Sequence, residues 1–395
     1  MRRSSFNWSQ TDPPMRPPCS PIARQYLRCH LSDGVGPVLL ARIIKHFGTL
    51  DEALGASVGG LTAVEGVGRR RAEAFFKARS DDRVEREIER AAALDARIIC
   101  WEDDDYPVPL RHCNDPPVCL YVRGTLEPQD AVAIAMVGSR RCSRYGCEQA
   151  RRFASLLAGA GFTIVSGLAR GIDGYAHDGA LIADGRTVGV LGCGIDVMYP
   201  PEHGPLAERV IAHGAMITED PLGSPPSADS FPRRNRIIAG LCLGVIVVEA
   251  AQKSGALITA RLASEYNREV FAVPGRVDMP TAHGPNDLIR RGAAKLVSSI
   301  EDILDELGDV GKTMNRTSPA EPGQADSVSP AGTPLASLTD TERSILASLA
   351  GDELRPDQLA DATGRDVAAI MAALTTLQIK GLVLSLPGNR VARRR

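Results

Sequence analysis

The central part of the chain alternates between short apolar runs and segments with helical spacing. Six runs rich in β-branched residues fall at 131–137, 162–166, 187–191, 215–218, 243–248 and 270–273. Helical patterns follow them at about 145–160, 174–184, 204–213, 233–240, 256–267 and 286–292. Strands that are apolar throughout and separated by helices are typical of a parallel sheet covered on both faces. The pattern therefore predicts an α/β fold class, with an extended Rossmann-like parallel sheet as its core domain at 82–307.

A smaller helical domain is predicted before this core, at 26–81, of the helix-hairpin-helix or SAM-like type. Gly-Val-Gly occurs there twice, at 34–36 and 66–68, each time directly before a helical pattern. Such turns can point backbone N–H groups at a nucleic-acid phosphate. Glycine can equally do no more than shorten the turns of an ordinary helical domain. The sequence leaves both interpretations open.

A winged helix is predicted at the other end, in residues 336–395. Thr339 and Glu342 form a capping box, and helices are expected at about 340–349, 356–363 and 366–380, before strands at 382–386 and 390–391. The third helix has a single cation, Lys380, at its end, whereas a helix that reads a DNA groove needs polar and basic side chains on its open face. A protein-binding role is therefore favoured over duplex binding, although the arginines at 393–395 could still contact phosphate.

Two segments show no periodicity and are predicted to be unstructured. Residues 1–25 are basic and Pro-rich without the apolar core of a secretory signal, so they are expected to form a disordered tail. Residues 308–335 are rich in Gly, Pro, Ser and Thr and are expected to form a flexible linker. Gly311-Lys-Thr313 within it is not a P-loop, because Glu306 occupies the position of the first glycine.

Composition narrows the class of protein. The chain of 395 residues has a net charge of −2, which argues against a polycationic DNA-packaging protein, and it lacks any apolar run long enough to span a membrane. Its nine cysteines include no Cys-x-x-Cys pair, so reduced thiols, no metal site and a cytoplasmic location are expected. Arginine supplies all but six of the 46 cations, and either a GC-rich genome or phosphate binding explains this bias.

Glycine, hydroxyl and arginine residues follow the predicted strands, where ligands bind in open parallel sheets. The loops begin at Gly138-Ser-Arg-Arg, Ser166-Gly-Leu-Ala-Arg and Gly192-Cys-Gly, and Phe231-Pro-Arg-Arg-Asn-Arg236 adds three guanidinium groups in one turn. Residues 138–152 carry five Arg and one Glu, whereas 101–105 hold four carboxylates, so the charge is segregated along the chain. Arginine suits bidentate phosphate contacts, and these loops therefore predict a phosphate-binding edge.

An enzyme is less well supported by the residues. No Gly-x-Gly-x-x-Gly follows a strand, so NAD binding is not expected. Asp173, His177, Asp196 and Glu249 are candidate catalytic groups, but no nucleophile or carboxylate pair accompanies them. A structural hydrogen bond is preferred for His177.

At these loops the sequence strongly resembles the DprA/Smf family, the DNA-processing protein A of bacteria. The similarity covers most of residues 100–300. The segments that carry it are Gly138-Ser-Arg140, SGLARGIDGYAH (166–177), GCGIDVMYPPEH (192–203), FPRRNRIIAGL (231–241), VVEAAQKSGALITARLASEYNREVFAVPG (247–275) and GPNDLIRRGA (284–293).

The resemblance implies a non-enzymatic protein without a cofactor. Such a protein binds and protects incoming single-stranded DNA and loads the RecA recombinase during natural transformation. The partners implied are single-stranded DNA, RecA, a second copy in a homodimer, and the single-strand-binding protein SSB. Phe231 would be the aromatic residue on which a base stacks. The DNA pocket implied by the family comprises Gly138, Ser139, Arg140, Ser166, Gly167, Arg170, Phe231, Arg234, Asn235 and Arg236.

One alternative function from another class is kept. LOG-like nucleotide phosphoribohydrolases are a related Rossmann type that also binds phosphate at glycine loops. They resemble a different pattern, Pro-Gly-Gly-x-Gly-Thr with a downstream Glu, and that string is absent from this chain. Its absence disfavours a nucleotide-processing enzyme.

Overall fold

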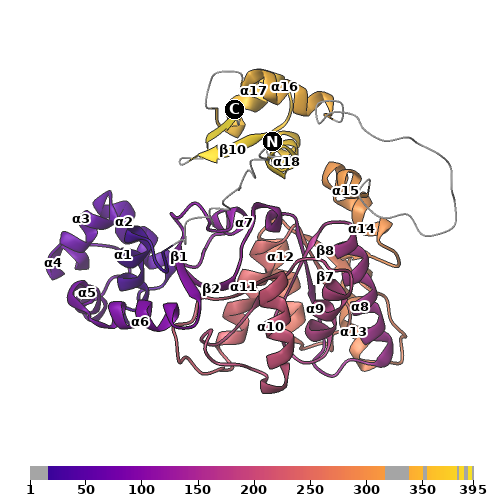
Figure 1. Cartoon of the computed structure of the whole chain (residues 1–395), viewed down its shortest axis with the longest axis horizontal. Helices are drawn as coiled ribbons and strands as arrows, with labels where there is room; N and C mark the ends of the chain where they lie inside the picture. The colour runs from indigo at the N-terminus through magenta and orange to yellow at the C-terminus, as the bar shows by residue number, and fades with distance from the viewer. Residues whose placement is uncertain (1–16, 316–337, 350–353, 380–381, 387–389, 394–395) are drawn as a thin grey trace, which may run out of the picture.

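The computed structural model describes residues 17–315, 338–349, 354–379, 382–386 and 390–393. Figure 1 shows a helical region formed by the first part of the chain, a central α/β body and a small C-terminal unit. None of the helices in these ranges combines the length and the apolarity that a membrane crossing requires.

The central body is built on a nine-stranded sheet in the order β1-β2-β6-β5-β4-β3-β7-β8-β9. The strands from β3 to β9 pair in parallel, whereas β2 is antiparallel to both β1 and β6. The chain winds outward from β3 through β4, β5 and β6, and then returns to the other side of β3 with β7. The strands are β1 (Ala96–Cys100), β2 (Cys119–Gly124), β3 (Ala133–Val137), β4 (Thr163–Ser166), β5 (Thr187–Val190), β6 (Gly214–Thr218), β7 (Gly244–Val247), β8 (Glu269–Ala272) and β9 (Lys295–Leu296).

All six predicted central strands are present, and the Rossmann-like parallel core is confirmed. The prediction missed β2 and β9. Strand β2 is an apolar run outside the strand–helix alternation, and strand β9 consists of only two residues, both exposed. Neither gives the periodic signal from which the other strands were inferred.

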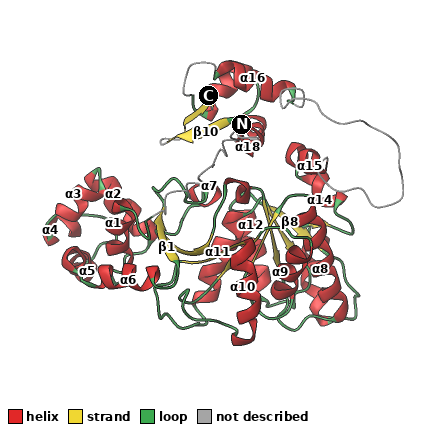
Figure 2. Cartoon of the chain, in the orientation of Figure 1, coloured by secondary structure: helices red, strands yellow, loops and turns green. Residues whose placement is uncertain are grey.

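Helices cover both faces of this sheet, as Figure 2 shows. On one face, Phe153 of α8 and Ile172 of α9 pack against Ile134 and Met136 of β3. On the other, Ile237 of α11 packs in the core with Val165 and Val188. The helices of the body are α7 (Val108–Arg111), α8 (Arg144–Gly159), α9 (Ile172–Ile182), α10 (Gly204–His213), α11 (Ser230–Leu241), α12 (Gly255–Glu265), α13 (His283–Arg290) and α14 (Glu301–Glu306).

The N-terminal region is helical, as predicted. Gly36 and Gly68 are the N-caps of α2 and α5, so both Gly-Val-Gly turns open a helix. Its apolar residues form one core with strands β1 and β2, so this region is continuous with the sheet. Its helices are α1 (Pro21–His30), α2 (Pro37–Phe47), α3 (Leu50–Gly55), α4 (Val58–Thr62), α5 (Arg69–Lys77) and α6 (Arg83–Ala92).

Two segments that the sequence predicts to be unstructured are helical in part. The tail was placed at 1–25, but α1 begins at Pro21, where the Ser20 hydroxyl accepts a hydrogen bond from Ala23 N and Ile98 N donates to Pro18 O. The linker was placed at 308–335, but α15 (Gly308–Asn315) is helical because Val310 and Met314 are buried against the sheet-covering helices. The remainder of each segment, 1–16 and 316–335, lies outside the described residues.

The C-terminal unit has the three helices and two strands of a winged helix. Its capping box at Thr339 and Glu342 is present as predicted. Leu359 and Leu377 are fully buried in a separate apolar core. The elements are α16 (Asp340–Ser348), α17 (Pro356–Thr363), α18 (Val367–Ile379), β10 (Val383–Leu386) and β11 (Arg390–Arg393).

Candidate nucleic-acid interface

The loops that follow β3 and β4 are locked together through their backbones. Ile172 N donates to Ser139 O over 3.2 Å, and Ser139 N donates to Glu249 O over 2.6 Å. A Cβ at Gly171, whose φ is +74°, would lie 2.2 Å from Ser139 O, so this approach requires glycine. A Cβ at Gly138 would likewise lie 2.5 Å from the Ile172 side chain. The two glycine loops predicted from the sequence therefore form one rigid surface.

The loop after β5 joins the same surface. The His203 ring nitrogen Nδ1 lies 2.9 Å from Leu168 O, which holds residues 192–203 against the loop after β4. Arg170 forms an exposed ion pair with Glu202 at this junction. The neighbouring guanidinium lowers the pKa of Glu202 to about 2, so this carboxylate is ionised at neutral pH. A phosphate that binds Arg170 must therefore compete with Glu202.

An aromatic and a guanidinium group meet at the centre of this surface. Phe231 is the second residue of α11 and is half-buried. The Arg140 Cζ atom lies 4.7 Å from the Phe231 ring centroid, within the range of a cation–π contact. Tyr199 from the loop after β5 lies on the same ring, with its centroid 5.8 Å away. Arg140 itself is exposed, so a cation and an aromatic face are presented side by side.

Arg234 supports this surface from below. A Cβ at Gly167 would lie 1.9 Å from Arg234 Nη1, so the guanidinium fills the space that the missing side chain leaves. Arg234 is buried, and Nη1 donates to Val190 O. Burial lowers the pKa of Arg234, and the nearby Asp173 carboxylate opposes this shift. The pKa of Asp173 is itself raised by burial. Arg234 Nε is buried without a hydrogen-bond partner among the described residues.

Ser166 and Asn235 are also buried under the loops. The Ser166 hydroxyl donates to Met136 O over 2.6 Å, and Asn235 Nδ2 donates to Gly255 O over 3.3 Å. Both side chains thus fix the backbone around the surface. A strand lying on the loops would not contact them unless the loops moved.

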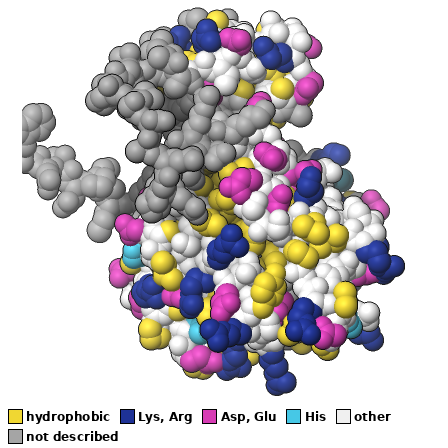
Figure 3. All heavy atoms as spheres, turned by 90° about the vertical axis from the view of Figure 1, so that its right-hand side faces the viewer, with side chains coloured by type: hydrophobic (Ala, Val, Ile, Leu, Met, Phe, Trp, Pro, Cys, Tyr) yellow, Lys and Arg dark blue, Asp and Glu magenta, His cyan; other side chains and the backbone are white. Residues whose placement is uncertain are grey.

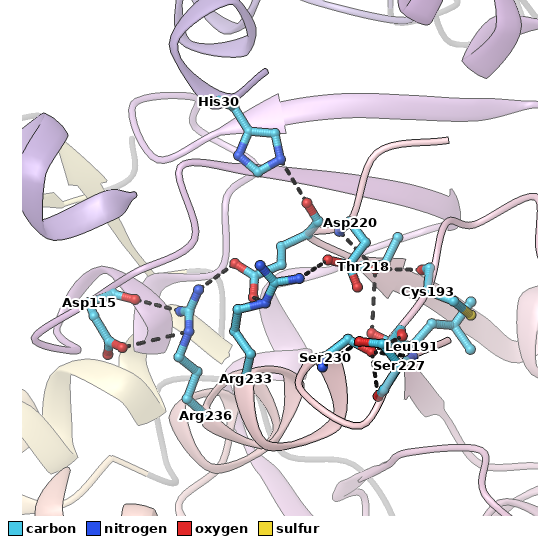
Figure 4. A network of polar contacts seen from close by, with 12 residues as sticks. His30, Asp115, Leu191, Cys193, Thr218, Asp220, Ser227, Ser230, Arg233 and Arg236 are labelled. Atoms are coloured by element: carbon cyan, nitrogen blue, oxygen red, sulfur yellow. Dashed lines mark hydrogen bonds and ion pairs between the residues drawn. The ribbon is translucent and has the colours of Figure 1, made fainter. Parts of the chain in front are cut away.

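Arg236 points away from the loops, into the network drawn in Figure 4. Its guanidinium is buried between Glu219 and Asp115, with Nη2 donating to Glu219 Oε2. Arg233, one turn earlier, pairs with Asp220 and Glu219 but is 56 % exposed. Arg233 and Arg236 are three residues apart and therefore lie on one face of α11, and that face turns toward carboxylates.

The same network connects the sheet with the helical region. His30 Nε2 lies 2.7 Å from Glu219 O, and burial lowers the pKa of His30 to about 4. Burial also raises the pKa of Glu219, although Arg236 opposes this shift. Arg236 is therefore placed as a structural cation between the two parts of the protein.

The candidate catalytic groups make structural contacts. His177 is fully buried with Nδ1 2.7 Å from Thr187 Oγ1, which is the structural role the sequence favoured, and burial lowers its pKa to about 3. The Glu249 carboxylate accepts from Ser143 N over 2.9 Å and from the Ser143 hydroxyl, so it holds the N-terminus of α8. Asp196 accepts from Gly223 N and pairs with Arg90. Within the described ranges, no cluster of His, Cys, Asp and Glu is arranged to hold a metal ion.

The sequence prediction omitted three residues that build the surface: Tyr199, Glu202 and His203. All three belong to the GCGIDVMYPPEH segment, from which the predicted pocket took no residue. Tyr199 is an aromatic residue in a glycine-rich loop at the end of a predicted strand, and this feature could have identified the segment as part of the surface.

On the face drawn in Figure 3, Lys and Arg side chains are interspersed with Asp and Glu and form no single basic patch.

Comparisons with known proteins give consistent matches. Residues 97–308 match the family model of DNA recombination-mediator protein A, and residues 329–389 match the DprA winged helix domain. Protein Smf of Synechocystis is 36 % identical over 383 residues, which cover 91 % of this chain and 96 % of that protein. Protein Smf of Escherichia coli is 41 % identical over 304 residues, covering 75 % and 78 %. The X-ray structure of DprA from Streptococcus pneumoniae superposes with a TM-score of 0.63 at 34 % identity, covering 72 % of this chain and 97 % of that one.

Proposed function

Since the chain belongs to the DNA recombination-mediator protein A family, known as DprA or Smf, we propose that it binds single-stranded DNA on the surface formed by the loops after β3, β4 and β5. In this proposal it protects the bound strand and transfers it to RecA during DNA uptake. The winged helix match at 329–389 adds the C-terminal unit to the residues that match this family.

The observation that carries the proposal is the position of Arg140 over Phe231. A base can stack on an aromatic ring whatever its identity, and a guanidinium beside it can contact the adjacent phosphate. The Arg140 side chain is exposed and forms no ion pair with a described residue, so its charge is available to a phosphate. Stacking and phosphate contact together bind a single strand without reading its sequence.

The buried groups around this surface support binding by keeping it rigid. Gly167 over Arg234, and Gly171 over Ser139, allow the loops to approach closely. A preformed surface loses less conformational entropy when a ligand binds. We therefore divide the predicted pocket into contact residues, Gly138, Ser139, Arg140, Arg170 and Phe231, and supporting residues, Ser166, Gly167, Arg234, Asn235 and Arg236.

The proposal assigns no reaction to the chain. Asp173, His177 and Glu249 each have a structural contact that explains their position. Homodimer formation, contact with SSB and RecA, and a cytoplasmic location are proposed from family membership.

A titration of the full chain against DNA at several salt concentrations tests the function. A labelled oligothymidylate and a duplex of equal length are compared by fluorescence anisotropy between low and moderate salt. We expect tighter binding of the single strand and a linear fall of log affinity with log salt, since phosphate contacts release counterions. Equal affinity for duplex DNA would contradict the proposed surface. RecA filament growth on SSB-coated single strands, with and without the chain, tests the mediator step.

A further inference from the structure

Two cysteine side chains touch beside the contact loop. Cys142 Sγ and Cys147 Sγ lie 2.9 Å apart, and both residues are half-buried. Cys142 ends the loop that carries Arg140 and directly precedes Ser143, the N-cap of α8. Cys147 is in the first turn of that helix, and Cys147 N donates to Ser143 O. These are the two positions whose side chains meet in a hydrophobic staple, so the helix start itself holds the sulfurs together.

The surroundings assign different roles to the two thiols. Burial, followed by the hydrogen bond to Cys147, raises the pKa of Cys142 to about 12, so Cys142 keeps its proton at neutral pH. The neighbouring Cys147 side chain raises the pKa of Tyr175 of α9. Because Cys142 keeps its proton, Cys147 is the first nucleophile of the pair. Glu249 is the carboxylate facing this site, and it disfavours ionisation of Cys142.

We propose that Cys142 and Cys147 are a reversible oxidation site that closes to a disulfide in exchange with a small-molecule disulfide. An S–S bond of about 2.05 Å requires the two sulfur atoms to approach by only about 0.9 Å. The Cys147 thiolate attacks one sulfur of the reagent, forms a mixed disulfide and releases one thiolate. Cys142 then loses its proton to that thiolate, attacks Cys147 Sγ and displaces the second thiolate, which is protonated by solvent. Two electrons pass from the protein to the reagent, and two small thiols result.

The bond would change the contact loop. It would tie the end of the loop to α8 covalently and displace Cys142 relative to the Ser143–Glu249 hydrogen bonds. Arg140 lies two residues before Cys142, so its position over Phe231 would shift. This consequence, unlike the chemistry of the bond, rests on the proposed function. We expect a roughly fivefold loss of single-strand affinity, equivalent to one hydrogen bond of ordinary strength.

Peptide mapping of the full chain tests the site directly. The protein is equilibrated with oxidised glutathione, free thiols are alkylated, and the chain is digested with trypsin. Arg144 lies between the two cysteines, so cleavage after Arg144 leaves residues 142–144 and 145–151 joined only if the disulfide has formed. We expect the joined peptides after oxidation, and their loss after dithiothreitol or in either Cys142→Ser or Cys147→Ser. Cys113→Ser, which removes a half-buried thiol bonded to Pro109 O, is the matched control and should keep them.

Both outcomes of the mapping are decisive. Alkylation of both cysteines at every glutathione ratio would show that the thiols are only an apolar staple and would overturn the proposal. Fluorescence anisotropy then compares the single-strand affinity of the oxidised wild-type protein with that of the variant that carries both Cys142→Ser and Cys147→Ser, treated in the same way. Unchanged affinity on formation of the bond would refute its effect on the loop, whereas failure of all reduced forms to bind DNA would refute the proposed function instead.

Discussion

The guanidinium of Arg140 lies 4.7 Å from the centre of the Phe231 ring, although all the elements from α8 to β6 separate the two residues in the sequence. The sequence indicated each residue separately, one as a cation after the first strand of the core and the other as the start of an arginine-rich turn. The parallel sheet brings them together because the carboxyl ends of its strands share one edge. Their contact provides both a stacking face and a positive charge.

Replacing Phe231 by Ala should weaken binding of single-stranded DNA by about 1–3 kcal/mol, the contribution of stacking one base on an aromatic ring. Arg140→Ala should weaken binding and also reduce the slope of log affinity against log salt by about one. Fluorescence anisotropy at four salt concentrations measures both. Arg261→Ala, which removes an exposed cation of α12 paired with Glu265, is the matched control. An unchanged salt slope in Arg140→Ala would show that Arg140 does not contact phosphate.

Arg236→Ala should act on stability, since the Arg236 side chain is 9 % exposed and so is that of its partner Glu219. Its removal breaks a buried ion pair and leaves the Glu219 carboxylate with only the exposed Arg233 as a counter-charge, and breaking a buried pair typically costs about 3–5 kcal/mol. Urea unfolding followed by circular dichroism measures the loss. Arg233→Ala is the comparison: Arg233 also pairs with Glu219, but from an exposed position, so we expect a loss of only about 0–1 kcal/mol. Equal losses in the two variants would contradict the structural role of Arg236.

The buried His177 should make stability fall with acid. Its pKa is lowered to about 3 in the folded protein, against an ordinary value of 6.5, so the unfolded chain binds a proton that the folded chain does not. The contribution of the neutral, buried His177 to the free energy of unfolding is therefore complete above pH 6.5. It is lost as pH falls toward 3, by about 1.4 kcal/mol per pH unit within that window. His177→Asn keeps a group that can hydrogen-bond Thr187 and cannot titrate. Unfolding free energies at pH 7, 6 and 5 should show a smaller pH slope in this variant, and identical slopes would refute the assignment.

The fold was largely predictable because its core strands are apolar on both faces. Runs such as 131–137 and 243–248 face helices on each side, and this pattern is visible without knowledge of pairing. The edge strand β9 has two exposed residues and no such pattern. Helix α15 was missed because two buried residues, Val310 and Met314, are too few to show a period in a segment rich in Gly and Thr.

The candidate site was predictable by residue type but not by side-chain direction. Arg140 and Arg236 are both arginines in motifs of one family, yet one is exposed beside an aromatic ring and the other is buried against Glu219. The sequence does not distinguish the two arginines, because the partners of Arg236, Glu219 and Asp115, come from distant segments of the chain. The sequence motifs therefore identified the region of the candidate site, and side-chain packing decides which of their residues can contact a ligand.

Glu249→Gln should destabilise the protein without abolishing an activity. The Glu249 carboxylate accepts two hydrogen bonds from Ser143 at the start of α8, and a neutral amide loses the charge that the helix N-terminus favours. We expect a loss of about 1–2 kcal/mol in unfolding free energy, similar to the loss of a helix cap. Chromatography of nucleoside monophosphates incubated with wild-type protein should show no released base. Base release that Glu249→Gln abolishes would instead establish the nucleotide-processing alternative.

Removal of the winged helix, residues 336–395, should leave binding of single-stranded DNA nearly unchanged. Helix α18 carries no charged residue, and its exposed side chains include the apolar Val367 and Met371, which suit a protein contact better than a phosphate backbone. It contacts η2 (Pro128–Ala131) and α15, away from the loops that carry Arg140 and Phe231. We expect the affinity of the truncated chain to stay within about 0.5 kcal/mol of the full chain, as for distant and independent sites. Thermal unfolding of the truncated chain is the control for its integrity. A large loss of affinity in a folded truncated chain would show that the winged helix itself binds DNA.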